Sequence, residues 1–469
     1  MYGSFDQRLG FLEVHKRLLE GGDSLSGVFG IYAPGENLSQ ITKYALYALQ
    51  HRGQESAGIA VSDGGQIYLS KGIGLVSEAF TNTKEIENIE TIAATGHVRN
   101  APSGKRSPAD AQPLLVRSRH GSLAVAHNGN LINAGELRDR LEKGGSIFQT
   151  STDSELVAHL AARCNHDDLE FALEEVLSQL HGAYSFVFMT EKKLFGVRDP
   201  YGFRPLSLGL WNGRYVIASE TSAFDTIGAE ALRDINPGEM VVIDENGLRS
   251  KQILPFKRNT LCIFEYIYLA RPDSNMSGIN VHMARKGFGR QLAVEHPVDC
   301  DIVIGVPDSS LAAASGYAEE AGVPYEMGLI KNRYIGRTFL RPQQNYRDIG
   351  VQLKLNPLKK VIEGKRVVVV DDSIVRGTTS KRLVGLLFRA GAKEVHLRIS
   401  SSPVISPCCY GVDTPTYEEL ISYKNDVEEI RRLVGATTLG YLSCEGMLKA
   451  MGMNEGEFCM ACFTGNYPI

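Results

Sequence analysis

The chain has 469 residues, and its 50 Lys and Arg residues against 54 Asp and Glu residues give a formal net charge of −4. This balance excludes the basic excess of a dedicated nucleic-acid-binding protein. The length predicts about two or three domains. Since the longest aliphatic run, residues 367–370, is far shorter than the roughly 20 apolar residues of a membrane span, we expect a cytoplasmic protein without a membrane segment.

Residues 1–25 are expected to form a leader-like segment. Phe5, Leu9, Leu12 and Leu19 follow a helical spacing, which predicts an amphipathic helix. Acidic and basic residues interrupt the segment, so it lacks the continuous apolar centre of a secretion signal.

The rest of the chain divides into two parts with different patterns. Residues 26–250 are rich in Gly and in short β-prone runs such as residues 214–218, which predicts an α+β domain with antiparallel sheets. Residues 251–469 alternate short apolar strands with helices, which predicts an α/β domain with a parallel sheet. The polar stretch 246–260 is the expected joint.

The strongest local motif begins at a buried strand, residues 367–370, that ends in Asp371 and Asp372. A Gly-Thr-Thr turn follows and leads into a helix, whose first backbone N–H groups can hold a phosphate. A bare Asp-Asp pair could merely end a strand, but the whole stretch favours a sugar-phosphate site.

Residues 367–380 resemble the fingerprint by which type I phosphoribosyltransferases bind 5-phosphoribosyl 1-diphosphate (PRPP). Residues 264–274, 305–310 and 329–334 resemble the amidophosphoribosyltransferases, and the resemblance covers residues 27–468. It implies an N-terminal-nucleophile glutaminase domain, an αββα sandwich, followed by a type I phosphoribosyltransferase domain. The implied reaction makes 5-phosphoribosylamine and pyrophosphate from PRPP with glutamine or ammonia, the first step of purine synthesis. Homotetramers inhibited by purine nucleotides are also implied.

The resemblance also implies roles for residues of the second part. Mg²⁺, which proteins hold through few oxygen ligands while substrate phosphates supply others, is expected at Ser309, Asp371 and Asp372. A flexible active-site loop is expected at residues 338–347, and Gln352 stands where the family usually has Arg. The implied PRPP-binding residues are Asp308, Ser310, Lys331, Ser373, Arg376, Gly377, Thr378 and Thr379.

The cysteines include a Cys-x-x-Cys pair, Cys459 and Cys462. By itself this pair is compatible with a redox site, zinc or chance, and four thiolates suit either zinc or an iron–sulfur cluster. The resemblance implies a structural [4Fe-4S] cluster, with Cys408 rather than the adjacent Cys409 as a ligand. The implied ligand set is Cys262, Cys408, Cys459 and Cys462, while Cys164, Cys300 and Cys444 are expected to be small buried apolar residues.

Residues 27–31 and 51–58 resemble the glutaminase domain, in which a cysteine freed by propeptide cleavage attacks glutamine. This chain has Ser26 at that position. The resemblance assigns the oxyanion hole to Asn128 and Gly129, and the binding of the glutamine carboxylate and ammonium groups to Arg99 and Asp153. A purely structural Asn-Gly hairpin turn is the alternative.

A serine hydroxyl is a poorer nucleophile than a thiol, and Pro102 removes a hydroxyl that the family commonly has near glutamine. We therefore expect impaired glutaminase activity beside an intact transferase. The main alternative is a catalytically silent paralogue that binds PRPP or nucleotides and has a regulatory role. An electron-transfer protein is a weaker third hypothesis.

Overall fold

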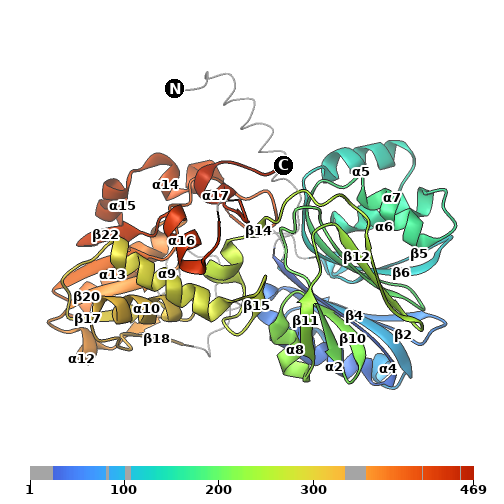
Figure 1. Cartoon of the computed structure of the whole chain (residues 1–469), viewed down its shortest axis with the longest axis horizontal. Coiled ribbons are helices and arrows are strands. Elements are labelled where there is room, and N and C mark those ends of the chain that lie inside the picture. Colours follow the sequence, from blue (N-terminus) through green and yellow to red (C-terminus); the bar gives the residue numbers. More distant parts are fainter. Residues whose placement is uncertain (1–24, 81–83, 101–106, 333–354, 415, 455) are drawn as a thin grey trace.

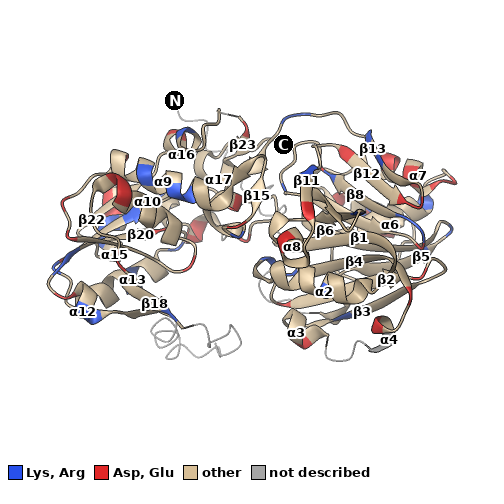
Figure 2. Cartoon of the chain, turned by 60° about the horizontal axis from the view of Figure 1, so that its bottom comes forward, with Lys and Arg blue, Asp and Glu red and all other residues tan. Residues whose placement is uncertain are grey.

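The computed structural model describes residues 25–80, 84–100, 107–332, 355–414, 416–454 and 456–469. The predicted leader, Pro102, Gln352 and the predicted active-site loop lie outside these residues. The chain forms two lobes (Figure 1), and acidic and basic residues are interspersed along both (Figure 2). Within the described part, no helix has the length and apolarity to cross a membrane.

The first lobe contains a seven-stranded antiparallel sheet of order β11-β9-β10-β1-β4-β2-β3. Small and apolar residues fill its centre: β1 is buried from Ser26 to Ala33. Its strands are β1 (Ser26–Glu36), β2 (Ser56–Ser62), β3 (Ile67–Ile73), β4 (Thr91–Arg99), β9 (Ser207–Trp211), β10 (Arg214–Ala218) and β11 (Glu230–Asp234).

A second antiparallel sheet, of six strands in the order β13-β12-β8-β7-β6-β5, faces the first. Val28 of one sheet and Ala126 and Val187 of the other lie in one buried cluster between them. The strands are β5 (Leu114–Ser118), β6 (Gly121–Leu131), β7 (Gly182–Met189), β8 (Leu194–Arg198), β12 (Glu239–Asp244) and β13 (Gly247–Gln252).

Helices cover the outer face of each sheet. Leu46 and Phe224 belong to the apolar cluster outside the first sheet, and Leu160 and Leu173 to the one outside the second. The lobe is therefore an αββα sandwich, as predicted. Its helices are α2 (Leu38–Ala48), α3 (Val76–Ala79), α4 (Lys84–Glu87), α5 (Ala134–Lys143), α6 (Ser154–Arg163), α7 (Leu169–Leu177) and α8 (Thr221–Ile227), with 3-10 turns η1 (Gln50–Arg52) and η2 (Pro108–Asp110).

The second lobe is built on a four-stranded parallel sheet of order β17-β20-β21-β22. Successive side chains of β20 point to opposite faces of the sheet. Val368 and Val370 lie in the apolar cluster that includes α9 and α10, and Val367 and Val369 lie in the cluster that includes α13 and α15. The predicted α/β domain is thus confirmed. The elements are α9 (Val281–Glu295), β17 (Ile302–Gly305), α10 (Leu311–Ala321), β20 (Arg366–Asp371), α13 (Thr378–Arg389), β21 (Glu394–Ile399), α15 (Val427–Val434) and β22 (Thr438–Tyr441).

The end of the chain returns to the beginning of this lobe, since β23 (Phe458–Cys459) pairs in parallel with β14 (Leu261–Cys262). The C-terminus lies where the two lobes meet (Figure 1). The remaining elements are η3 (Glu265–Leu269), β15 (Asn275–Met276), β16 (Ile279–Asn280), β18 (Leu329–Lys331), β19 (Leu355–Pro357), α12 (Lys359–Ile362), η5 (Tyr417–Glu419), α14 (Ile421–Lys424), α16 (Cys444–Met451) and α17 (Ala461–Thr464).

Buried charges join the lobes. Arg52 of the first lobe donates to Glu220 in its own lobe and to Glu265 in the second, and all three side chains are fully buried. Arg204 donates to Glu265 at 3.2 Å and to the main-chain oxygen of Tyr410 at 2.7 Å. Because unpaired buried charges are very costly, these ion pairs oppose separation of the lobes.

Candidate active sites

The predicted transferase residues meet at the carboxyl ends of β17 and β20, which are neighbours in the parallel sheet. The Ser309 hydroxyl donates to Asp372 Oδ2, and the Ser310 hydroxyl donates to Asp371 Oδ1 at 3.3 Å. This edge is where ligands bind in open parallel sheets. The structure thus brings Ser309, Ser310, Asp371 and Asp372 together.

Both carboxyl groups of this pair lie in a buried environment. Burial and the neighbouring charge of Asp372 raise the pKa of Asp371 above its ordinary value. Burial also raises the pKa of Asp372, although hydrogen bonds from Ser309 and Ser373 act in the opposite direction. A cation at this point would offset the cost of burying two adjacent carboxylates. The donors are carboxylate and hydroxyl oxygens, which fit Mg²⁺.

The predicted phosphate-binding turn follows directly. Gly377 has φ +75° and precedes the first residue of α13, and a Cβ there would lie 2.5 Å from Ile421 Cδ1. The left-handed backbone therefore favours glycine, and any larger residue would also require the Ile421 side chain to move. Thr378 and Thr379, the first residues of α13, are exposed. Ser373 donates to Asp372 at 2.8 Å, whereas Arg376 pairs with Glu419 at 3.1 Å.

A cavity of about 580 Å³ lies beside this edge of the sheet. The predicted residues Asp308 and Lys331 line it and form an ion pair of 2.9 Å. Sequence reasoning missed its apolar wall, which includes Tyr325, Met327 and Ile330. Met327 is 64% exposed, but isolated apolar residues carry no chemical motif by which a sequence could reveal them.

The predicted glutaminase residues meet at the start of β1. Ser26 is fully buried and pairs with Arg99 on β4. The backbone N–H of Ser26 donates to Asn128 Oδ1 at 3.2 Å. Residues 26, 99 and 128, far apart in the chain, are thus neighbours across the two sheets.

The Asn128-Gly129 pair lies within β6 rather than in a hairpin turn. Asn128 Nδ2 is buried and has no hydrogen-bond partner among the described residues. Gly129 has φ +149°, and a Cβ there would lie 2.0 Å from the Ala183 carbonyl oxygen. A buried donor without a partner is costly in a purely structural role. The arrangement therefore fits an oxyanion hole better than a structural turn.

Asp153 lies at the same site and is almost fully buried. Its Oδ1 is 3.3 Å from His127 Nδ1, and its Oδ2 accepts a hydrogen bond from the Leu131 N–H at 2.9 Å. Burial alone would raise the pKa of Asp153, but His127 and Arg99 lower it below its ordinary value. The sequence did not predict that His127 contacts Asp153. A histidine next to the predicted Asn-Gly pair was the available signal.

The four predicted cluster cysteines, Cys262, Cys408, Cys459 and Cys462, line one cavity together with Phe264 and Tyr410. Cys409 does not line it, and all eight cysteines are free thiols. The side chains that the structure brings together at this cavity are thus the four thiols that the sequence predicted. Four thiols at one cavity suit either zinc or an iron–sulfur cluster.

Comparisons with known proteins match both lobes. One family model, a glutamine amidotransferase domain, matches residues 97–226, and another, a phosphoribosyl transferase domain, matches residues 291–402. The amidophosphoribosyltransferase of Bacillus subtilis is 53% identical over 456 residues, which cover 96% of this chain and 95% of that protein. The chain belongs to the amidophosphoribosyltransferase family. The relative from Methanocaldococcus jannaschii is 47% identical and covers 95% and 98% of the two chains.

Solved structures agree with this assignment. One, described as the allosteric regulatory enzyme of purine biosynthesis, has a TM-score of 0.90 at 52% identity and covers 94% of this chain and 96% of that one. Another is the B. subtilis enzyme in complex with ADP and GMP, with a TM-score of 0.89 at 52% identity over 94% and 97% of the two chains. The protein is thus a pentosyltransferase of the first step of purine synthesis, and these relatives do not favour a silent paralogue.

Proposed function

We propose that this amidophosphoribosyltransferase uses ammonia efficiently and glutamine poorly, because its PRPP fingerprint at residues 367–380 is intact and its glutaminase nucleophile position holds Ser26. The observation that carries the proposal is the location of Ser26, buried against Asn128 and Arg99 where an attacking group is needed. The reaction at the transferase end replaces the pyrophosphate of PRPP by an amino group.

In the transferase half, Ser309, Asp371 and Asp372 would hold Mg²⁺, whose charge would neutralise the departing pyrophosphate. The hydroxyls of Ser373, Thr378 and Thr379 and the first N–H groups of α13 bind the 5-phosphate, with Gly377 giving the turn its shape. Arg376 adds a positive charge at the rim of this turn. Asp308, Ser310 and Lys331 position the pyrophosphate end of PRPP.

In the glutaminase half, Arg99 and Asp153 hold the carboxylate and ammonium groups of glutamine. Asn128 Nδ2 and the Gly129 N–H stabilise the oxyanion that forms when the amide is attacked. The Ser26 hydroxyl occupies the nucleophile position. Its proton must be removed during attack, which makes it far less reactive than a thiol.

We further propose a [4Fe-4S] cluster at Cys262, Cys408, Cys459 and Cys462 that stabilises the C-terminal segment and takes no part in catalysis. The shared cavity of these cysteines supports it.

We divide the chain into a leader (residues 1–25), a glutaminase domain (26–250) and a transferase domain (251–469). We also propose that the protein is a homotetramer and that purine nucleotides inhibit it. The complex of the B. subtilis relative with ADP and GMP supports the inhibition.

The experiment that tests this function measures pyrophosphate release from PRPP by anaerobically purified protein, with and without Mg²⁺. Ammonium and glutamine serve in turn as the only nitrogen donor. We expect Mg²⁺-dependent release with ammonium and little release with glutamine. Equal rates with both donors would refute the impaired glutaminase. No release with either donor, in protein that retains its iron, would refute the transferase assignment.

A further inference from the structure

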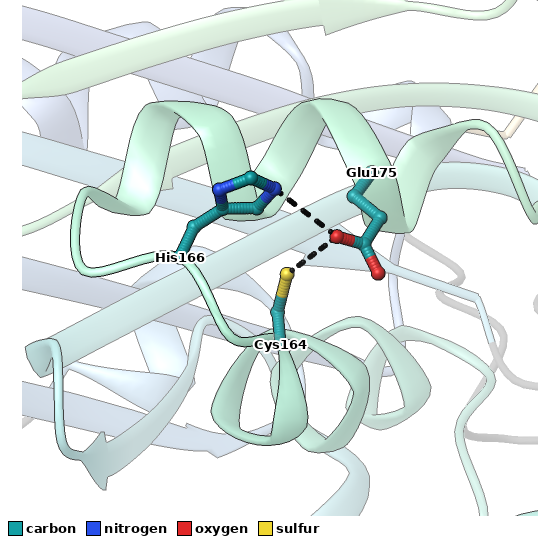
Figure 3. Close-up of side chains that lie close together, drawn as sticks. All are labelled: Cys164, His166 and Glu175. Carbon is teal, nitrogen blue, oxygen red and sulfur yellow. Dashed lines mark hydrogen bonds and ion pairs between the residues drawn. The ribbon is translucent and has the colours of Figure 1, made fainter.

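Cys164, His166 and Glu175 form a cluster on the outer helical layer of the glutaminase lobe (Figure 3). Asp153 of the glutamine site precedes the first residue of α6, and Cys164 follows the last. The ten residues of α6 place the cluster about 15 Å from that site, at about 1.5 Å rise per residue. The cluster therefore belongs to neither candidate active site.

Cys164 is buried, as expected, but its thiol also makes a polar contact that the sequence did not predict. The thiol donates to Glu175 Oε2 at 3.0 Å. His166 Nε2 lies 3.2 Å from the same carboxylate oxygen. Cys444, expected to be buried as well, is only half-buried.

The three ligand atoms lie mutually within 4.8 Å, and no other His, Cys, Asp and Glu group in the described part of the chain meets this criterion. Tetrahedral Zn²⁺ with ordinary bond lengths would need the sulfur about 3.6 Å and the imidazole nitrogen about 3.4 Å from the carboxylate oxygen. The observed 3.0 and 3.2 Å are close to these values. Small side-chain rotations would bring all three atoms to one ion.

The backbone that carries these side chains is well fixed. Leu160 of α6 and Leu173 and Val176 of α7 lie in one buried cluster, which holds the two helices together. The Cys164 N–H bonds to the carbonyl oxygens of Leu160 and Ala161. All three ligands thus come from one helix–loop–helix unit. The His166 and Glu175 side chains are 49% and 53% exposed, which leaves room for a water ligand.

We propose that Cys164, His166 and Glu175 bind one Zn²⁺ ion, with water as the fourth ligand. A thiolate, an imidazole and a carboxylate are the ligands that zinc prefers, whereas Mg²⁺ and Ca²⁺ take oxygen ligands. On binding, the Cys164 thiol loses its proton to solvent and its sulfur bonds the metal. The ion would tie the end of α6 to α7 and would have a structural role.

The test measures Zn²⁺ bound per chain by equilibrium dialysis of the full-length, cluster-containing protein, prepared without oxygen. We expect Cys164→Ser and His166→Gln to bind one equivalent less than the native chain. His166 is exposed, so its variant should fold even if Cys164→Ser does not. The matched control, Cys444→Ser, removes a cysteine outside both cysteine sites and should bind as much Zn²⁺ as the native chain.

X-ray absorption at the zinc edge identifies the ligands of the bound ion. We expect one sulfur at about 2.3 Å and the remaining ligands, nitrogen or oxygen, at about 2.0–2.2 Å. Four sulfur ligands would place the zinc in the other cysteine site and overturn the proposal. Nitrogen and oxygen ligands alone, or equal binding by all variants, would show adventitious binding and would also overturn it.

Discussion

Asn130 and Cys409 are joined across the two lobes, since Asn130 Nδ2 donates to the main-chain oxygen of Cys409 at 2.7 Å. Beside this bond, a Cβ on Gly411 would lie 3.0 Å from the Gly129 carbonyl carbon. Gly129, which we propose as part of the oxyanion hole, therefore lies directly against the segment that carries Cys408. One segment, residues 408–411, thus carries a proposed cluster ligand and contacts the proposed glutaminase site.

We predict that Asn130→Ala, introduced together with Ser26→Cys, lowers the glutamine-dependent rate about 10- to 100-fold relative to Ser26→Cys alone. Loss of a buried hydrogen bond costs about 1–3 kcal/mol, and the Gly129 N–H would lose its fixed direction. The ammonium-dependent rate should stay unchanged because neither Asn130 nor Cys409 belongs to the groups at the transferase edge. Pyrophosphate release with each donor checks this, and an equal loss with both donors would contradict it.

The buried ion pairs between the lobes give a stability prediction. Glu265→Gln keeps the side-chain shape but leaves Arg52 and Arg204 without their shared charge partner. Removing one partner of a buried ion pair costs about 3–5 kcal/mol, so the urea midpoint should fall markedly. The control Glu428→Gln breaks an exposed pair with Arg431 and should not shift the midpoint. Similar midpoints for both variants would contradict the account.

A pH prediction follows from His97. Its Nε2 lies 2.8 Å from the His127 carbonyl oxygen, and burial lowers the pKa of His97 to about 3. Between that value and the ordinary 6.5, the unfolded chain binds a proton that the folded chain does not, so stability falls as pH falls. From pH 7 to pH 5 this lowers the free energy of unfolding by about 2 kcal/mol.

The measurement is urea unfolding of the native chain and His97→Gln at both pH values. The variant should lose about 2 kcal/mol less than the native chain over this interval, because it lacks the proton-binding group. Equal losses in the two proteins would show that His97 does not remain neutral in the folded state.

Much of the fold could be predicted because its patterns are local. The apolar run at residues 367–370 and its two terminal carboxylates are sufficient to predict a strand edge with a phosphate site. The joint expected at residues 246–260 was wrong in part, since Gly247–Gln252 forms the edge strand β13. Arg249 and Lys251 lie on this exposed edge, and a polar edge strand lacks the apolar alternation that predicts strands.

Site residues could be predicted where they belong to a recognisable sequence motif. They could not be predicted where only the tertiary fold brings them together. Asn128 and Gly129 follow from their motif, but the pairing of Asp153 with His127 depends on the docking of α6 against β6. The same holds for Cys164 and Glu175, whose contact requires α6 and α7 to pack side by side. No spacing rule in the sequence predicts either pair.

Two neighbouring cysteines provide a matched test of the cluster. Cys459→Ser removes a residue that lines the shared cavity, whereas Cys409→Ser removes one that does not. We predict that Cys459→Ser loses the iron and the broad visible absorption of the cluster, and that Cys409→Ser retains both. Iron analysis of anaerobically purified protein checks this. Equal iron loss in the two variants would contradict the assigned ligand set.

The central claim is that one atom at position 26 limits the use of glutamine. Ser26→Cys replaces the hydroxyl by a thiol in the same buried position beside Asn128, and a thiol attacks far more readily. We therefore measure the ratio of glutamine-dependent to ammonium-dependent pyrophosphate release in the native chain and in Ser26→Cys. The account predicts that this ratio rises about 100-fold or more while the ammonium rate is unchanged. An unchanged ratio, in a variant that folds and retains its iron, would contradict it.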